Sequence, residues 1–79
     1  MNRFQAMAMI MAKLTTDCYL KPASTEYKLA RKLAAELIDL IGPAAAVRKV
    51  TEAGTYSLDR LERLCIQLRI VGNFPYRAF

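Results

Sequence analysis

The stretch "TEYKLARKLAAELIDLI", residues 25–41, decides the fold. Its apolar side chains recur at helical spacing and cover about half of a helical wheel. They are Tyr27, Leu29, Ala30, Leu33, Ala34, Leu37, Ile38, Leu40 and Ile41. The charged side chains of the same stretch share the opposite side. The pattern therefore predicts one long amphipathic helix that buries a wide face.

Helix-ending residues flank this stretch on both sides. Ser24 or Thr25 is placed as an N-cap, and Glu26 follows in the first turn, where a carboxylate favours the positive end of the helix dipole. Gly42 is expected to end the helix in a left-handed conformation. Pro43 cannot continue that helix, but it suits the first position of the next one. We expect a second helix to start at once.

The N-terminal segment "MNRFQAMAMIMAKL" predicts another helix, because Ala and Met are good helix formers and β-branched residues are scarce. We expect its buried stripe to consist of Phe4, Met7, Met11, Leu14 and Cys18. Met9 projects away from that stripe and is a candidate contact for a partner. The apolar run is too short to span a bilayer, and no cleavage site follows it, so we expect part of a soluble protein.

Two shorter patterns complete the chain. A helix from Pro43 to about Ala53 is expected to use Ala46, Val47 and Val50 as its apolar contacts, with Gly54 ending it. The last helix is expected from the Ser57 cap to about Val71, with Gly72 and Asn73 ending it. Tyr56 precedes the cap and is placed to pack on Leu61 as a hydrophobic staple.

These patterns predict an all-α fold: a small domain of four helices, two longer amphipathic ones and a short helix-turn-helix-like hairpin. With 79 residues and 8.9 kDa, we expect residues 1–79 to form one domain. So small a domain cannot bury all of a hydrophobic fraction of 54% inside itself. We therefore expect it to associate with a second copy, as a homodimer, or with another protein.

The residue inventory excludes most catalytic chemistry. Histidine is absent and there are only 2 cysteines, so the chain lacks the ligands of a Cys/His zinc site and the base of a His-dependent triad. Cys18 and Cys65 lie on apolar stripes and are expected to be buried free thiols, which indicates a reducing, cytoplasmic location. Glu36 and Asp39 stand beside Lys32 and are expected to form surface ion pairs. We predict no enzyme, cofactor, metal or small-molecule substrate.

The chain carries a formal net charge of +5 and has a pI near 9.6. Such a charge suits nucleic acid, an anionic membrane or an acidic protein surface, and of these we expect no membrane partner. The basic residues are spread along the chain and form no polybasic arm. An ordinary solvated surface therefore remains an equal alternative to a binding site for anions.

The stretch "VRKVTEAGTYSLDRLERLCIQL", residues 47–68, resembles the helix-turn-helix superfamily, in which two helices flank a tight turn. Apolar residues are expected about six and nine positions beyond the turn glycine, but Arg60 and Arg63 stand there. A turn longer by one residue places Leu61 and Leu64 at these positions, and leaves Thr51 where a small apolar residue is expected. The resemblance implies a dimeric DNA-binding regulator that uses residues 43–71.

If the chain reads DNA, its candidate contacts are the outward basic and amide side chains of this region. They are Arg48, Lys49, Arg60, Arg63 and Gln67. Asp59 and Glu62 lie on the same face and repel phosphates. Asp59 and Arg63 are also spaced as an ordinary surface ion pair. The face is therefore mixed in charge, and a structural hairpin remains the competing interpretation.

Ile66 and Ile70 lie one turn apart on the charged side of the last predicted helix, where an isolated helix has no reason to expose them. Either the aromatic tail "NFPYRAF" covers them or another chain does. The second alternative predicts a protein-docking face made of Arg60, Arg63, Ile66, Arg69, Ile70, Tyr76 and Arg77. Our first hypothesis is thus a non-enzymatic regulatory protein, an inhibitor or adaptor of the size found among phage and mobile-element proteins; the DNA-binding regulator is the alternative.

Overall fold

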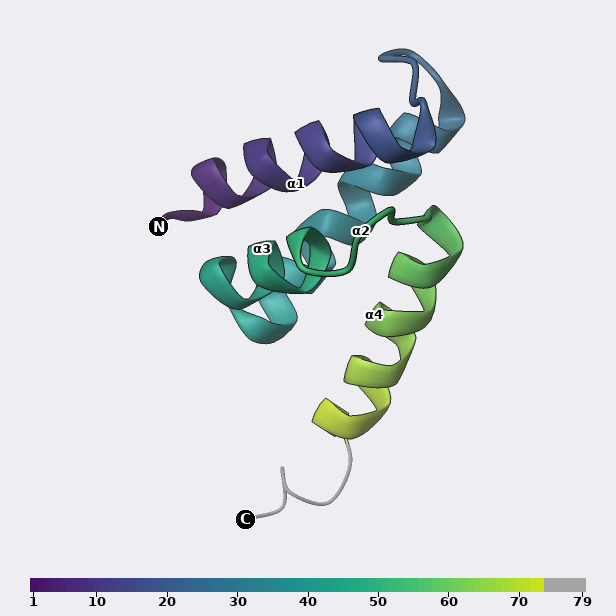
Figure 1. The fold of residues 1–79 in the computed structure, drawn as a ribbon. Helices are drawn as coiled ribbons and strands as arrows, with labels where there is room; N and C mark the ends of the chain where they lie inside the picture. Colours follow the sequence, from purple (N-terminus) through teal and green to yellow (C-terminus); the bar gives the residue numbers. More distant parts are fainter. Residues whose placement is uncertain (74–79) are drawn as a thin grey trace.

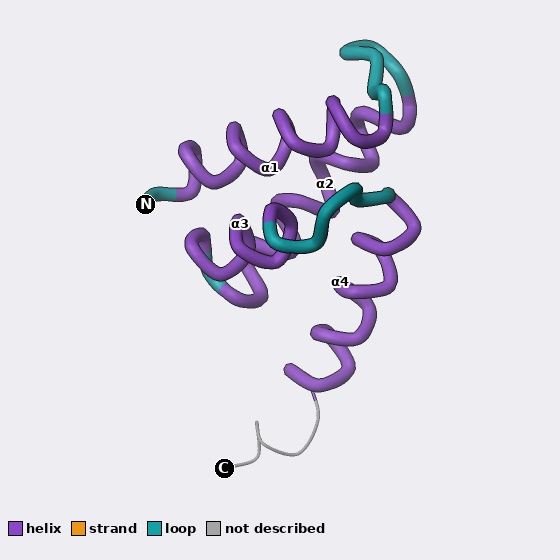
Figure 2. Tube along the Cα trace, in the orientation of Figure 1, coloured by secondary structure: helices purple, strands orange, loops and turns teal. Residues whose placement is uncertain are grey.

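The computed structural model describes residues 1–73, which form four α-helices: α1 (Arg3–Cys18), α2 (Thr25–Ile41), α3 (Pro43–Thr51) and α4 (Leu58–Asn73) (Figure 1). The predicted all-α, four-helix class is confirmed. No strand occurs in this part of the chain, and its loops are the short segment before α1 and the connections between helices (Figure 2). None of the helices in residues 1–73 is both long and apolar enough to cross a membrane.

The helix starts follow local capping chemistry. The Ser24 side chain accepts a hydrogen bond from the backbone N–H of Tyr27 at 3.1 Å, and Ser57 does the same for Arg60 at 3.1 Å. These bonds satisfy N–H groups that have no partner inside the helix. Both predicted caps are confirmed. The N-cap of α1 is Asn2, which forms a capping box with Gln5.

The helix ends depart from expectation in two places. α3 ends at Thr51 rather than near Ala53, and α4 continues to Asn73 instead of stopping at Val71. Gly42 has the predicted positive φ of 88°, but its ψ of 160° places it outside the left-handed helical region. The reason is that Gly42 belongs to both helices. Its N–H donates a hydrogen bond to the carbonyl of Ile38 at 2.8 Å, the last bond of α2, and its carbonyl accepts one from the N–H of Ala46 at 3.0 Å, the first bond of α3.

α1 ends in a less common way. Tyr19 adopts the left-handed helical conformation, with φ 54° and ψ 46°, and its side chain is 89% exposed. Among the described residues it is the only non-glycine residue with positive φ. Glycine is the usual residue in this conformation because a Cβ atom makes it strained.

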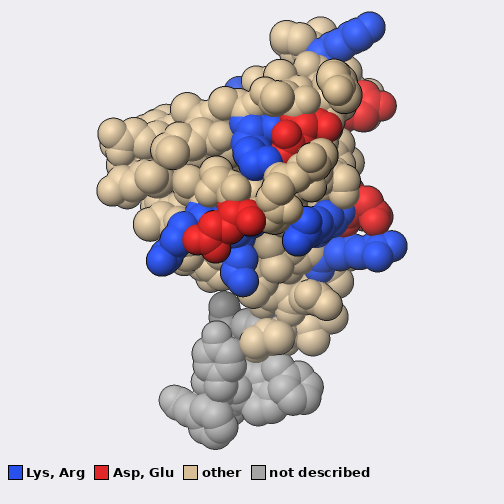
Figure 3. Space-filling view, in the orientation of Figure 1, with Lys and Arg blue, Asp and Glu red and all other residues tan. Residues whose placement is uncertain are grey.

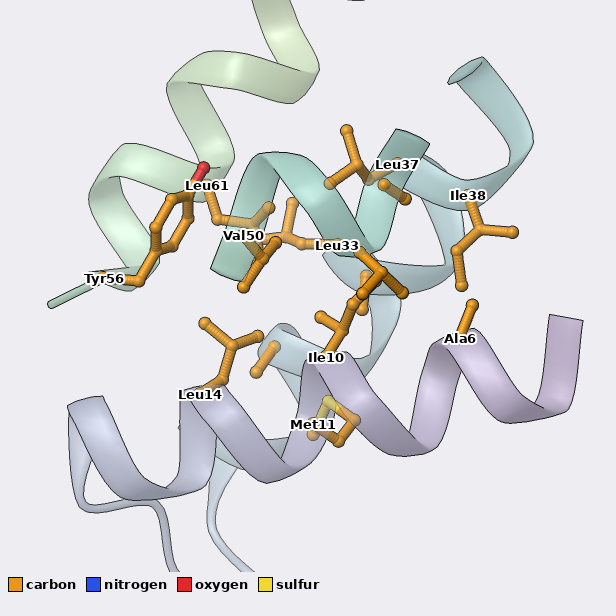
Figure 4. Packing of buried hydrophobic residues seen from close by; sticks show 14 of the residues in the cluster. Ala6, Ile10, Met11, Leu14, Leu33, Leu37, Ile38, Val50, Tyr56 and Leu61 are labelled. Atoms are coloured by element: carbon orange, nitrogen blue, oxygen red, sulfur yellow. The ribbon is translucent and has the colours of Figure 1, made fainter. Parts of the chain in front are cut away.

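One core joins all four helices. α1 packs on α2 and α3, while α4 packs on α2. Figure 4 shows side chains of α1 pointing toward those of α2 and α3, with Ile10 in the middle of the cluster. The largest fully buried side chains are Ile10, Leu14, Leu37, Val50, Leu61 and Cys65. No polar or charged residue is buried among the described residues.

The buried face of α2 was predicted well and that of α1 poorly. Ala30, Leu33, Ala34, Leu37 and Ile38 are buried as expected, whereas Leu29 at the edge is 39% exposed. On α1 the buried residues are Ala6, Ile10, Met11 and Leu14. The prediction that Phe4 begins this stripe is wrong, because its side chain is 85% exposed. The small Ala6 faces Ile38 instead, which lets α1 approach α2 closely (Figure 4).

Candidate functional site

α4 is anchored on α2 by a short row of contacts. Leu61 and Cys65 are fully buried, and the thiol of Cys65 donates to the backbone carbonyl of Leu33 at 3.5 Å. One turn further on, the guanidinium Nε of Arg69 lies 2.5 Å from a carboxylate oxygen of Glu36. This row fixes which side of α4 faces α2 and therefore which side faces away.

The start of α4 is held by the end of α1. The Asp17 carboxylate accepts a hydrogen bond from the backbone N–H of Tyr56 at 2.9 Å and also pairs with the ammonium group of Lys13. That ammonium group donates to the carbonyl of Gly54 as well. The hydrogen bond from Lys13, followed by that from Tyr56, holds the pKa of Asp17 below its ordinary value of 3.8. Residues 52–57 are thus fastened to α1 before α4 begins.

The outward side of α4 carries apolar side chains. Ile66 is 43% exposed, Ile70 61% and Val71 56%. Beside them lies a groove of about 350 Å³, lined by Leu64, Gln67, Leu68, Ile70 and Val71. The prediction that Ile66 and Ile70 lie outside the core is confirmed. We call Ile66, Ile70, Val71 and the groove the α4 face.

The three arginines predicted for docking lie on α4, but each has a partner within the chain. The Arg60 guanidinium lies 5.1 Å from the ring centroid of Tyr56 and donates to the carbonyl of Ala53 at 3.3 Å. Arg63 pairs with Asp59 at 3.2 Å, which is the surface pair expected from their spacing. Arg69 pairs with Glu36, as described above. Tyr76 and Arg77 lie outside the described residues, as does most of the tail, the first of the two alternatives for covering Ile66 and Ile70.

The residues suggested for DNA contact lie on two different helices. Arg48 and Lys49 are exposed in the last turn of α3, whereas Arg60, Arg63 and Gln67 belong to α4. The two helices are present and joined by residues 52–57, but α3 packs chiefly on α1 and α2, and α4 on α2. In a helix-turn-helix, by contrast, the first helix supports the second directly.

The individual helix-turn-helix positions give a mixed result. Leu61 is fully buried and Leu64 partly buried, as the longer turn predicts. Thr51 stands where a small apolar residue was expected, and its hydroxyl donates to the carbonyl of Val47 at 2.8 Å. That bond satisfies the hydroxyl group within α3, so the threonine causes no unpaired polar group there.

Both cysteines are free thiols, as predicted, but only Cys65 is also buried as expected. Cys65 is fully buried, and burial, aided by the nearby Glu36 carboxylate, raises its pKa to about 11. Cys18 is half-buried, and its pKa is also raised, first by burial and then by the neighbouring Asp17. Such thiols are poorly ionised at neutral pH and are weak nucleophiles.

The carboxylates of α2 are paired, but not with the residue expected. Glu36 pairs with Arg69 of α4 and Asp39 with Arg3 of α1, rather than either with Lys32. Tertiary packing brings these arginines within reach, which spacing along α2 alone does not show. Among the described residues, no group of three or more acidic or cysteine side chains is placed to hold a metal ion.

The sequence prediction missed a second exposed apolar surface, on α1. Phe4 and Met9 are exposed there, together with Met1. Only Met9 was predicted to point outward. The signal that identifies this surface is the absence of charge: residues 4–12 form the longest stretch of the sequence without a charged side chain.

Comparison with known proteins adds no relationship. No protein-family model matches the chain, and neither a curated protein nor a solved structure shows significant similarity to it.

Proposed function

We propose that this chain is a non-enzymatic regulatory protein, of inhibitor or adaptor type, that docks onto another protein through the α4 face. The observation that carries the proposal is the exposure of Ile66, Ile70 and Val71 beside a groove, on a helix that is fixed along its other side. A rigid apolar face with a groove is the usual receptor for an amphipathic helix. The free thiols support a reducing compartment, the cytoplasm, as its location.

The charge of the chain indicates what kind of helix the partner presents. The net charge of +5 attracts acidic surfaces. Arg60 lies on the same helix as the α4 face, and its internal partners are a ring and a carbonyl group, which leave its positive charge uncompensated. We therefore propose an amphipathic helix that fills the groove with apolar side chains and carries carboxylates at its rim.

The test is capture of a partner by immobilised protein, followed by mapping of the contact. Ile66→Asp together with Ile70→Asp is expected to abolish capture while leaving the helical circular-dichroism signal intact. The matched control adds the same charge at exposed alanines elsewhere, Ala23→Asp with Ala44→Asp, and is expected to keep capture. Amide exchange in the purified complex is expected to slow in the C-terminal half of α4. Unchanged capture by the isoleucine variant, or protection confined to other helices, contradicts the proposal.

The second candidate function is the dimeric DNA-binding regulator, which the exposed pair Arg48 and Lys49 favours. It receives less support because Arg63 already has a carboxylate partner, and because α3 packs chiefly on α1 and α2, and α4 on α2, rather than on each other. The discriminating measurement is a fluorescence-anisotropy titration with mixed-sequence duplex DNA at low and physiological salt. Binding that falls steeply with salt, and that Arg48→Ala with Lys49→Ala weakens, favours DNA binding. No binding at low salt leaves protein docking as the better proposal.

A further inference from the structure

α1 presents a second exposed surface that the proposed function does not use. Its exposed apolar residues are Phe4, Ala8, Met9 and Ala12, and we call these four, together with Met1 just before the helix, the α1 outer face. Phe4 is 85% exposed, Met1 60% and Met9 46%. In the view of Figure 3, the surface over the N-terminal half of α1 shows neither acidic nor basic side chains, whereas acidic and basic groups lie side by side elsewhere.

The polar groups next to this face already have partners within the chain. The Gln5 side chain accepts a hydrogen bond from the backbone N–H of Asn2 at 3.0 Å, as part of the capping box. Arg3 pairs with Asp39 of α2, and Lys13 pairs with Asp17. Covering the α1 outer face therefore leaves neither cation without its counter-ion.

We infer that the α1 outer face is the contact between two copies of this chain. Two molecules of net charge +5 repel one another over most of their surface, and the repulsion is weakest where uncharged faces meet. An uncharged apolar face is also complementary to itself, as a two-fold contact requires. An acidic partner, by contrast, gains nothing from a face without free cations. The α1 outer face thus fits a second copy better than it fits the partner proposed for α4.

The side-chain sizes on the face define the arrangement. A two-fold axis perpendicular to α1 makes the two helices antiparallel, which also pairs their dipoles favourably. Ala8 and Ala12 are small, so the two backbones can come close together. With the axis between positions 8 and 9, Met9 of one copy lies over Ala8 of the other, and Phe4 lies near Ala12 of the other copy. The bulky residues of one copy thereby fill the space left by the small residues of its partner.

The size of the contact determines the expected strength. α1 has 16 residues and is about 24 Å long. A single pair of helices of this length gives a contact at the low end of protein interfaces, so we expect a dimer that dissociates in the micromolar range or above. The association should therefore depend on protein concentration.

Sedimentation equilibrium between about 10 μM and about 1 mM tests this inference. Ala8→Glu places like charges next to the two-fold axis and is expected to raise the dissociation constant at least about 10-fold. The matched control is Ala44→Glu, the same substitution at an exposed position of α3, which is expected to have no effect. A monomer at all concentrations, or equal effects of the two substitutions, overturns the inference.

A cross-link provides a second measurement that does not depend on weakening the dimer. Cysteine at position 8 lies near the axis in the antiparallel arrangement, so Ala8→Cys is expected to form a disulfide-linked dimer under mild oxidation. Ala44→Cys and the unaltered chain, with its buried Cys65 and half-buried Cys18, are the controls. A dimer in solution whose position-8 cysteines do not cross-link overturns the assignment to α1.

The same experiments distinguish the α1 outer face from the α4 face. Ile66→Asp with Ile70→Asp is expected to leave the sedimentation of the chain unchanged, since these residues are outside the α1 outer face. If that variant dissociates the dimer and Ala8→Glu does not, the self-contact lies on α4 and the inference is wrong. Loss of partner capture in the isoleucine variant tests only the proposed function.

Discussion

The carboxylate of Asp17, at the end of α1, accepts a hydrogen bond from the backbone N–H of Tyr56, just before α4, at 2.9 Å. These residues are far apart in the sequence, and no periodicity or cap predicts their contact. Together with the bond from Lys13 to the carbonyl of Gly54, it ties the connection between α3 and α4 to α1. The orientation of α4 therefore depends on α1 as well as on α2.

The first prediction concerns pH. The folded chain holds the pKa of Asp17 below its ordinary value of 3.8, so the folded state binds fewer protons there than the unfolded state. The stability from this carboxylate is present above about pH 4 and is lost as the pH falls through the lowered pKa. Asp17→Asn is therefore expected to lower the free energy of unfolding at pH 6. The difference between this variant and the unaltered chain is expected to shrink as the pH falls. Urea unfolding of both chains between pH 6 and pH 2.5 measures the difference.

Asp59→Asn is the control for this prediction. Asp59 pairs with Arg63 at the surface, where ion pairs contribute little to stability. Its substitution is expected to leave the unfolding midpoint nearly unchanged across the same range. An Asp17→Asn variant whose stability follows that of the unaltered chain at every pH contradicts the assigned role.

The second prediction concerns the thiols. With a pKa of about 11, roughly one Cys65 thiol in ten thousand is ionised at pH 7, and the sulfur is fully buried. We expect iodoacetamide to modify the folded chain at Cys18 only, and slowly, and to modify both cysteines in denaturant. In the Cys18→Ser variant the folded protein is expected to resist modification. Mass spectrometry measures the rate of modification. Rapid modification of Cys65 in that variant would show that α4 separates from α2 more readily than its contacts suggest.

The third prediction compares two leucines of α2. Leu37 is fully buried and Leu29 is 39% exposed. Leu37→Ala removes buried methyl groups and leaves a cavity, so we expect it to lower the free energy of unfolding by about 2–5 kcal/mol. Leu29→Ala makes the same chemical change at the edge of the helix and is expected to cost less than about 1 kcal/mol. Equal losses in urea titrations would contradict the described packing of α2.

The fourth prediction concerns the left-handed residue at the end of α1. Because the Tyr19 side chain is 89% exposed, Tyr19→Gly loses little packing while it relieves the strain of positive φ. We expect a net stabilisation of about 0.5–1 kcal/mol, since glycine also makes the unfolded chain more flexible. Tyr19→Ala keeps the Cβ atom and therefore the strain, and is expected to give no gain. Thermal unfolding of the three chains separates these outcomes.

Local patterns were enough to predict the four helices, the Ser24 and Ser57 caps and the exposure of Ile66 and Ile70. All of these depend on interactions within a few residues along the chain. The buried side of α1 was misjudged because size favoured Phe4, whereas the close approach of α1 to α2 requires the small Ala6. Hydrophobicity alone cannot decide between a bulky and a small residue when the distance between two helices is unknown.

The contacts around the candidate site could not be predicted for a related reason. Glu36 meets Arg69, and Asp39 meets Arg3, only because α2 lies between α4 and α1. The mutual support of α3 and α4 was overestimated, since the sequence shows that two helices follow one another but not which neighbour each one packs against. The exposure of Ile66 and Ile70 on the α4 face could be predicted because it depends on the pattern of one helix. The groove of that face could not be predicted, because it depends on how the side chains are placed.

Gly42 also determines where the chain tolerates a change in length. One residue ends α2 and begins α3, with a backbone conformation that is essentially restricted to glycine. An insertion at this corner would shift Ala46, Val47 and Val50 out of register with the core. The corner between α2 and α3 should therefore keep a fixed length in any diverged copy of this fold, and peptide tags or loop extensions do not belong there.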